Sequence, residues 1–232
     1  MFRRFGQTIL MLGAIALLLG GCGNNQQKNQ ASSGKLKLQQ IDFDLATVGQ
    51  APPGFSTAVT DGGAPGTWVV LEDATSRYGK NVLAQTSTDP TNARYPLCIF
   101  DEVSAKDVAV SVAYKPVSGK VDQAAGIAIR LKDKDNYYLL RANALENNVR
   151  FYKVVGGKRT QLATAGAPVA SGQWHSLAIR SSGKGFEASM DGKLVLSAED
   201  DTFKDAGKIA LWTKADSVTY FDRLSIVTEP GQ

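Results

Sequence analysis

Reactive side chains are scarce in this sequence of 232 residues. It contains one histidine, His175, and two cysteines, Cys22 and Cys98. This set excludes a zinc site of the usual Cys/His kind and a disulfide framework. It also excludes a Ser-His-Asp triad with a spare histidine. Cys98 lies in an apolar run, so we expect it to pack as a small hydrophobic residue. His175 shares a strand face with apolar neighbours, so we expect a structural histidine at the edge of the core.

Cys22 has a different setting, because it ends a short apolar leader. Two arginines precede an apolar run over residues 9–19, which is shorter than the ~20 residues that span a bilayer. The run ends in Leu-Gly-Gly-Cys, which resembles the lipobox of bacterial lipoproteins. The resemblance implies that residues 1–21 are a signal peptide and that Cys22 carries lipid. An ordinary secretory leader with a chance cysteine is the alternative.

The lipobox resemblance also implies a membrane partner and an extracytoplasmic location. Two or three acyl chains hold a protein stably at a membrane. Because Gly23, not Asp, follows the cysteine, we expect the outer membrane in a diderm organism and the outer face of the cell membrane otherwise. Residues 22–36 are polar and lack periodicity, so we expect a flexible tether that leads to one domain over residues 37–232.

The net charge gives no support for a nucleic-acid partner. The formal charge is +4, and loss of Arg3 and Arg4 with the leader lowers it to +2. The remaining basic residues are scattered, with no cluster that would follow a phosphate backbone.

The rest of the sequence has an all-β pattern. Short β-branched and aromatic runs recur at intervals of about 8 to 14 residues between turn-forming residues. Asp191-Gly192, Gly156-Gly157 and Lys132–Asn136 predict hairpins, and therefore an antiparallel meander. So many strands must stack as a sandwich of two sheets. The expected strands are residues 38–44, 67–72, 81–85, 97–100, 107–114, 125–131, 137–142, 149–154, 160–164, 174–180, 185–190, 193–197, 208–213 and 218–227.

Alternation along these strands predicts four outward side chains. Arg130 and Trp212 each alternate with apolar neighbours, so they point away from the side that those neighbours bury. Tyr137 and Arg141 share one face with Leu139. We take this face as outward, because an unpaired buried guanidinium would cost several kcal/mol.

Several motifs gather within residues 120–226: Gly126-Ile127 with Arg130, Asp135-Asn136-Tyr137-Tyr138 with Arg141, Trp174-His175, Asp191-Gly192-Lys193, and Gly207 followed by Trp212 and Phe221-Asp222. With them the sequence resembles the concanavalin A-like lectin/glucanase jelly rolls of the laminin-G-like kind. It is most similar to bacterial 3-keto-disaccharide hydrolase domains and family-16 glycoside hydrolases. The resemblance implies a two-sheet antiparallel sandwich, one sheet of which is bent so that its concave face holds a glycan.

The resemblance makes an oligo- or polysaccharide the expected partner. Sugar recognition needs flat aromatic surfaces for the CH faces and polar groups for the hydroxyls. The candidate ligand-binding residues are therefore Arg130, Tyr137, Arg141 and Trp212. The alternative is that the aromatic rings pack in the core and the arginines are solvated.

The sequence favours binding over catalysis and leaves enzymatic activity open. Retaining hydrolysis in the family-16 manner needs two carboxylates about 5–5.5 Å apart, and the Glu-x-Asp-x-x-Glu motif that supplies them is missing. The strand Val108–Lys115, where keto-disaccharide hydrolase relatives often carry an acid, has none. A glycan-processing hydrolase of that type, and an envelope scaffold that binds protein and no sugar, remain the two alternatives.

No cofactor is required by this interpretation, but a structural calcium ion is possible. Jelly rolls of this class often hold Ca²⁺ between the first and last strands, and the resemblance makes Asp42, Asp44 and Asp222 candidate oxygen ligands. The alternative is that these aspartates cap strand ends.

Overall fold

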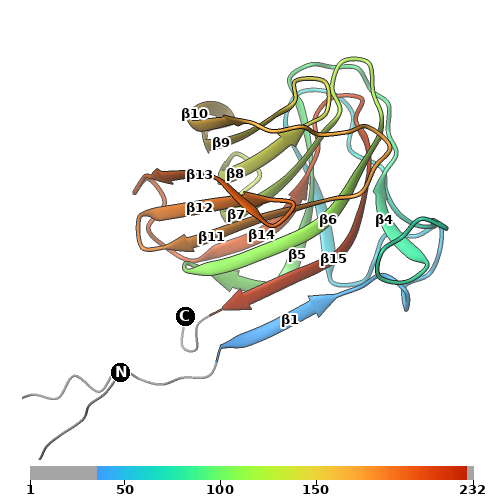
Figure 1. The fold of residues 1–232 in the computed structure, drawn as a ribbon, viewed down its shortest axis with the longest axis horizontal. Helices are drawn as coiled ribbons and strands as arrows, with labels where there is room; N and C mark the ends of the chain where they lie inside the picture. The colour runs from blue at the N-terminus through green and yellow to red at the C-terminus, as the bar shows by residue number, and fades with distance from the viewer. Residues whose placement is uncertain (1–35, 229–232) are drawn as a thin grey trace, which may run out of the picture. The chain divides into compact units, whose positions relative to one another are not determined.

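The computed structural model describes residues 36–228, which form fifteen strands in two antiparallel sheets, the predicted sandwich (Figure 1). Sheet A has the order β13-β12-β11-β6-β15-β4-β3, with β1 also paired to β15, and sheet B has the order β10-β9-β8-β7-β14-β5-β2. Within these residues no helix is long and apolar enough to cross a membrane. The predicted signal peptide, Cys22 and all of the tether except Leu36 lie outside the described residues.

The strand bounds are as follows. Sheet A contains β1 (Lys37–Ile41), β3 (Trp68–Glu72), β4 (Asn81–Gln85), β6 (Val108–Ser118), β11 (His175–Ser182), β12 (Gly185–Met190), β13 (Lys193–Glu199) and β15 (Val218–Thr228). Sheet B contains β2 (Phe55–Asp61), β5 (Arg94–Ala105), β7 (Ala124–Asp133), β8 (Asn136–Asn143), β9 (Asn148–Val155), β10 (Lys158–Gly166) and β14 (Gly207–Trp212).

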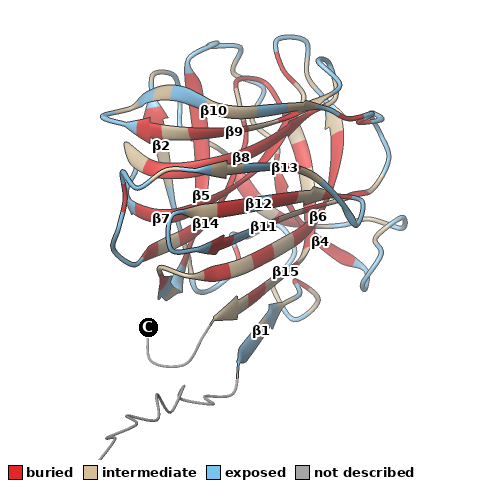
Figure 2. Cartoon of the chain, turned by 60° about the vertical axis from the view of Figure 1, so that its left-hand side comes forward, coloured by how far each residue is buried: buried red, intermediate tan, exposed pale blue. Residues whose placement is uncertain are grey.

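The main core lies between the sheets, where alternate residues of facing strands meet. On β8, Tyr138 and Leu140 point into this core, and on β11 Leu177 and Ile179 do so from the other sheet. Tyr138 meets Phe186 of β12 at a ring-centroid distance of 4.6 Å. Figure 2 shows the buried residues gathered on the central strands, whereas β1 and β10 at the edges are largely exposed or half-buried.

A second apolar cluster covers the outer face of sheet B. It contains the residues of β5, β7, β8, β9 and β14 that alternate with those of the main core, among them Tyr95, Tyr137, Tyr152 and Trp212. Sheet B is therefore buried on both faces. Antiparallel sheets commonly have one face in contact with solvent.

The predicted hairpins are present. Asp191 and Gly192 have φ values of 48° and 76°, and Gly156 and Gly157 have 55° and 78°, as the two-residue turns that match the twist of a hairpin require. Strands β7 to β10 form the expected meander. One strand, β2, was not predicted, and every other strand overlaps an expected range.

Candidate functional site

Three of the four predicted ligand-binding residues lie on the outer face of sheet B, as alternation indicated. Tyr137 and Arg141 are on β8, and Trp212 ends β14. All three are buried, with exposed fractions of 0%, 2% and 0%. The direction of these side chains is confirmed, but the expectation of an open aromatic surface at these positions is wrong, because neighbouring side chains of the second cluster cover them.

Arg130 is a correction, because it does not lie on the outer face. The register of β7 shifts between Ile129 and Asp133, and Arg130 has a φ of 48°. Such a bulge breaks the two-residue alternation and re-aims the side chain. The guanidinium of Arg130 lies over the rings of Tyr138 and Phe186, which belong to the main core.

The partners of Arg130 give it a structural role. It donates to the carbonyl oxygens of Lys106 at 2.8 Å, Phe203 at 2.9 Å and Gly183 at 2.6 Å, and it pairs with Asp107 at 3.2 Å. With 1% of its surface exposed, this arginine ties three loops together and presents nothing to a ligand.

Aromatic rings stack at the centre of the outer face of sheet B. Tyr95 lies against Trp212 with ring centroids 5.5 Å apart and an interplanar angle of 16°. Arg159 of β10 lies over this group, its guanidinium carbon 4.3 Å from the Tyr95 centroid, 5.3 Å from that of Tyr152 and 5.8 Å from that of Trp212. Burial raises the pKa of Tyr137, next to this group on the same face, to about 12.

Arginines surround these rings with donors that have no acceptor. Nine buried side-chain polar atoms within residues 36–228 lack a hydrogen-bond partner, and four of them belong to this face: Nε of Arg141 and Arg150, Nη1 of Arg159 and Nε1 of Trp212. Buried donors are almost always paired with protein, water or ligand. These four atoms are covered, so the basic groups of this face that remain partly accessible are the half-buried side chains of Arg150 and Arg159.

A polar network closes one end of this face. Arg141 donates from both terminal nitrogens to Glu146, each bond 3.1 Å long, and Arg150 pairs with the same carboxylate at 3.0 Å. The bond from Arg141 lowers the pKa of Glu146 to about 2. Asp122 pairs with Lys214 at 2.7 Å. Both acids at this end are thus paired with basic side chains.

Sequence reasoning missed the residues that line this face alongside the predicted ones. These are Tyr95, Tyr152, Arg150 and Arg159. Alternation in the run VRFYKVV places Arg150 and Tyr152 on one face, which was a usable signal. Nothing local to β10 indicates that Arg159 reaches across to β5.

The three candidate calcium ligands, Asp42, Asp44 and Asp222, do not all lie around one point. Asp42 is exposed, and no group of three or more His, Cys, Asp or Glu side chains suited to a metal ion occurs in the described part of the chain. Asp44 and Asp222 do bind opposite ends of one loop, residues 76–81. Asp222 Oδ2 accepts from Ser76 Oγ and two backbone N–H groups, and Asp44 Oδ1 accepts the N–H groups of residues 80 and 81.

One oxygen in this region has the character of a cation ligand. Asp222 is 1% exposed, and its Oδ1 has no hydrogen-bond partner. Asp44 accepts hydrogen bonds from two backbone N–H groups, and these bonds lower the pKa of its carboxyl group. A cation held by Asp222 Oδ1 would have to take its remaining oxygen ligands from groups other than a cluster of carboxylates.

The two remaining reactive residues are structural. Cys98 is fully buried, and burial raises the pKa of its thiol. His175 is 7% exposed, contacts Asp191 Oδ2 through Nδ1 at 2.9 Å and accepts the N–H of Ala170 at Nε2.

Comparisons with known proteins agree with this architecture. Residues 98–224 match the family model described as the concanavalin A-like lectin/glucanases superfamily, so the chain belongs to that superfamily. A search of curated protein sequences found no match.

Solved structures of carbohydrate-binding proteins share the fold. The carbohydrate-binding module CBM66 from Bacillus subtilis has 23% sequence identity and a TM-score of 0.57, over 73% of this chain and 92% of that one. The Ca²⁺- and mannose-bound lumenal domain of VIP36 has 12% identity and a TM-score of 0.58, over 83% and 91%. A Bacteroides ovatus GH16 enzyme of a mixed-linkage glucan locus, in complex with its product, has 13% identity and a TM-score of 0.58, over 81% and 99%.

Proposed function

We propose that this protein binds a glycan on the outer face of sheet B, through Arg150 and Arg159. The observation that carries the proposal is the pair of half-buried arginines on this face, Arg150 and Arg159, the second of which lies over stacked aromatic rings. Sugar hydroxyls accept hydrogen bonds from guanidinium groups. The shared fold of proteins that bind mannose and a glucan product supports the proposal.

Binding is favoured over hydrolysis by the state of the acids on this face. A general acid must be protonated at the working pH, and its pKa is usually raised. Glu146 has a pKa of about 2, and Asp122 is paired with Lys214. Both carboxylates therefore serve to hold basic residues in place. Release of reducing sugar by the purified protein would support the hydrolase alternative.

The test is retention on a glycan array and titration of each retained glycan by calorimetry. We expect Arg150→Ala and Arg159→Ala to weaken binding about tenfold each, because each removes charge-assisted hydrogen bonds. Lys158→Ala is the matched control, since Lys158 is an exposed cation beside Arg159 and lies outside the proposed contact.

Two results would overturn the proposal. One is retention of no glycan by the wild-type protein across neutral and acidic polysaccharides. The other is a glycan whose affinity is unchanged by both arginine substitutions. Specific capture of an envelope protein in place of glycan would instead favour the scaffold alternative.

We also propose that the protein is held at the outer face of a membrane through lipid on Cys22. The support is the leader sequence: a basic start, a short apolar run and Gly-Gly-Cys. On this proposal, residues 22–36 carry the sandwich away from the lipid surface, so that the glycan-binding face is free to meet its ligand.

A structural calcium ion at Asp222 is proposed as well. The unpaired, buried Oδ1 of Asp222 supports it, and Asp44 holds the same loop from its other end. The ion would stabilise residues 76–81 against the last strand and would take no part in glycan contact on sheet B.

A further inference from the structure

The aromatic side chains that are not fully buried gather on the face of the sandwich opposite to the proposed site. Of all aromatic residues within 36–228, only Phe55, Tyr78, Trp174 and Tyr220 are not buried. Phe55 packs against the main core. The other three lie on the outer face of sheet A, around β6, β15 and the start of β11. Exposed aromatic residues clustered on one face commonly mark a binding surface.

Two of these rings are held in fixed positions by a buried lysine. Lys115 Nζ lies 5.3 Å from the ring centroid of Trp174 and 5.0 Å from that of Tyr220. The ammonium is itself paired with Asp73, and Trp174 Nε1 donates to Thr75 Oγ1 at 3.1 Å. The rings are therefore pre-organised, so a ligand that stacks on them loses little entropy in ordering them.

Beyond Trp174, the next side chains of β11 that point outward are small. Its residues Ser176 and Ala178 are half-buried, and Arg180 is exposed. Alternate residues of a strand are about 6.6 Å apart, so roughly 20 Å separates Trp174 from Arg180. A row of small side chains with an aromatic ring at one end and a guanidinium at the other has the dimensions of an oligosaccharide site, not a monosaccharide site.

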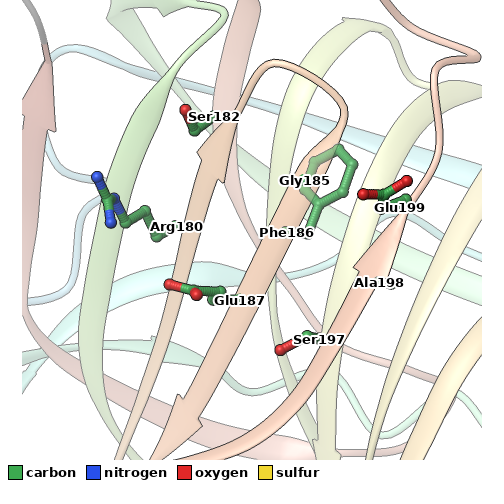
Figure 3. Close-up of a pocket in the computed structure, with 8 residues that line it drawn as sticks. All are labelled: Arg180, Ser182, Gly185, Phe186, Glu187, Ser197, Ala198 and Glu199. Carbon is green, nitrogen blue, oxygen red and sulfur yellow. The ribbon is translucent and has the colours of Figure 1, made fainter.

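The Arg180 end of this row is hollowed. Figure 3 shows Arg180 and Glu187, cross-strand neighbours on β11 and β12, in a hollow of about 450 Å³ that also includes Ser197 and Glu199. Arg180 also lines two adjoining hollows of about 260 and 270 Å³. Neither Arg180 nor Glu187 forms an ion pair within the described residues, so both have polar atoms available to a ligand.

We infer that the outer face of sheet A is a second binding site, for an uncharged oligosaccharide that lies along β11 from Trp174 to Arg180. The ring of Trp174 stacks on sugar CH faces, and Arg180 with Glu187 offers donors and acceptors together, the combination that hydroxyl groups use. Because the two charges are adjacent and opposite, they give no net attraction for an acidic ligand. This site does not depend on the one proposed on sheet B, and together they would let one domain hold two glycan chains.

The experiment measures how many ligands bind and where. The full-length protein in detergent is titrated by calorimetry with soluble mixed-linkage β-glucan, arabinan, xylan and mannan oligosaccharides of increasing length. We expect two ligands per protein. The double variant Trp174→Ala/Arg180→Ala should lose the ligand at sheet A and keep the one at sheet B. The double variant Arg150→Ala/Arg159→Ala should lose the ligand at sheet B and keep the one at sheet A. Affinity at the sheet A site should rise with oligosaccharide length until the ligand spans the row.

Single substitutions keep the test independent of folding defects. Arg180→Ala alone should weaken binding at this site about tenfold, and Trp174→Phe, which keeps an aromatic ring, should retain it. Lys158→Ala serves as the charge control. One ligand per protein, lost with the sheet B pair and unaffected by the sheet A pair, overturns this inference and leaves the proposed function in place. One ligand lost only with the sheet A pair overturns the sheet B site, and no binding to any oligosaccharide overturns both.

Discussion

Arg141 and Arg159 both bring a guanidinium to the outer face of sheet B, and their partners give them different roles. Arg141 places both terminal nitrogens on Glu146, a bidentate pair that fixes its geometry. Arg159 faces aromatic rings, is half-buried and forms no ion pair among the described residues. In a cation–π contact the guanidinium uses its flat face, so the N–H groups at its edge stay available for hydrogen bonds. Arg141 therefore supports the face, and Arg159 is free to make contact.

Burial makes Trp212 a stability residue. Its side chain is fully buried against Tyr95, so Trp212→Ala should leave a large cavity and reduce the free energy of unfolding by about 3–5 kcal/mol. Chemical denaturation followed by circular dichroism measures this. Trp174→Ala, at a half-exposed position, should cost clearly less. Equal stability of wild type and Trp212→Ala would contradict the packing described for this face.

Calcium should raise the melting temperature if Asp222 is a ligand. A ligand that binds only the folded state stabilises it by mass action. We expect a higher midpoint in millimolar Ca²⁺ than in chelator for the wild type, and no such difference for Asp222→Asn. Asp42→Asn should keep the full calcium response, because Asp42 is exposed. Identical midpoints with and without Ca²⁺ in the wild type would remove the proposed ion.

The pKa of Glu146 predicts a specific loss of stability in acid. Its folded value of about 2 lies below the ~4.3 of an unfolded glutamate. A depressed pKa contributes stability above the unfolded value, and this contribution disappears as the pH falls from about 4.3 to about 2. Glu146→Gln should flatten the stability profile across that window in urea unfolding measured at a series of pH values. A variant profile parallel to that of the wild type would show that the carboxylate is not stabilised by its arginines.

At the scale of strands, prediction succeeded where local signals were complete. The bounds expected for β4 and β12 are those observed, because turn residues flank short alternating runs. Strand β2 was missed because its sequence, FSTAVTD, has no continuous apolar run and follows Pro and Gly. It is an edge strand paired only with β5, and its Phe, Val and Thr residues favour the extended conformation.

The candidate site was less predictable than the fold, for a physical reason. Alternation gives the direction of a side chain, and it was correct for Tyr137, Arg141 and Trp212. Whether an outward residue is covered depends on residues far away in the sequence, here Tyr95 and Arg159. Alternation also fails at a bulge, as at Arg130, because the extra residue changes the period.

That bulge is locked by a close backbone approach at Gly207. A Cβ at position 207 would lie 2.4 Å from the carbonyl carbon of Arg130 and 2.7 Å from the nitrogen of Leu131. Gly207→Ala should therefore displace β14 from β7 and destabilise the protein by about 1–3 kcal/mol, measured by thermal unfolding. Gly166→Ala is the control, because nothing lies within 4 Å of a Cβ there. A tolerated alanine at position 207 would show that the bulge can relax.

For the whole molecule, the anchor proposal predicts how the protein fractionates. Cys22→Ser removes the thiol that would accept lipid, so the variant should move from the membrane pellet to the soluble extracytoplasmic fraction. Metabolic labelling with a fatty acid should mark the wild type alone. A Cys22→Ser protein that stays in the pellet through washes with high salt would contradict lipid anchoring.

Strand β15 has a consequence for how this chain folds over time. It lies between β6 on one side and β4 with β1 on the other (Figure 1). In its pairing with β1, Thr228 lies opposite Lys37, so residues from the two ends of the described sequence are neighbours. Without residues 218–228, sheet A consists of three pieces that have no strand pairing with one another: β13-β12-β11-β6, β4-β3 and β1. Pairing over such long sequence separations is slow. A chain that emerges from its N-terminus therefore cannot complete its sandwich until the last strand arrives. Pairing of the C-terminal strand is the step that completes folding.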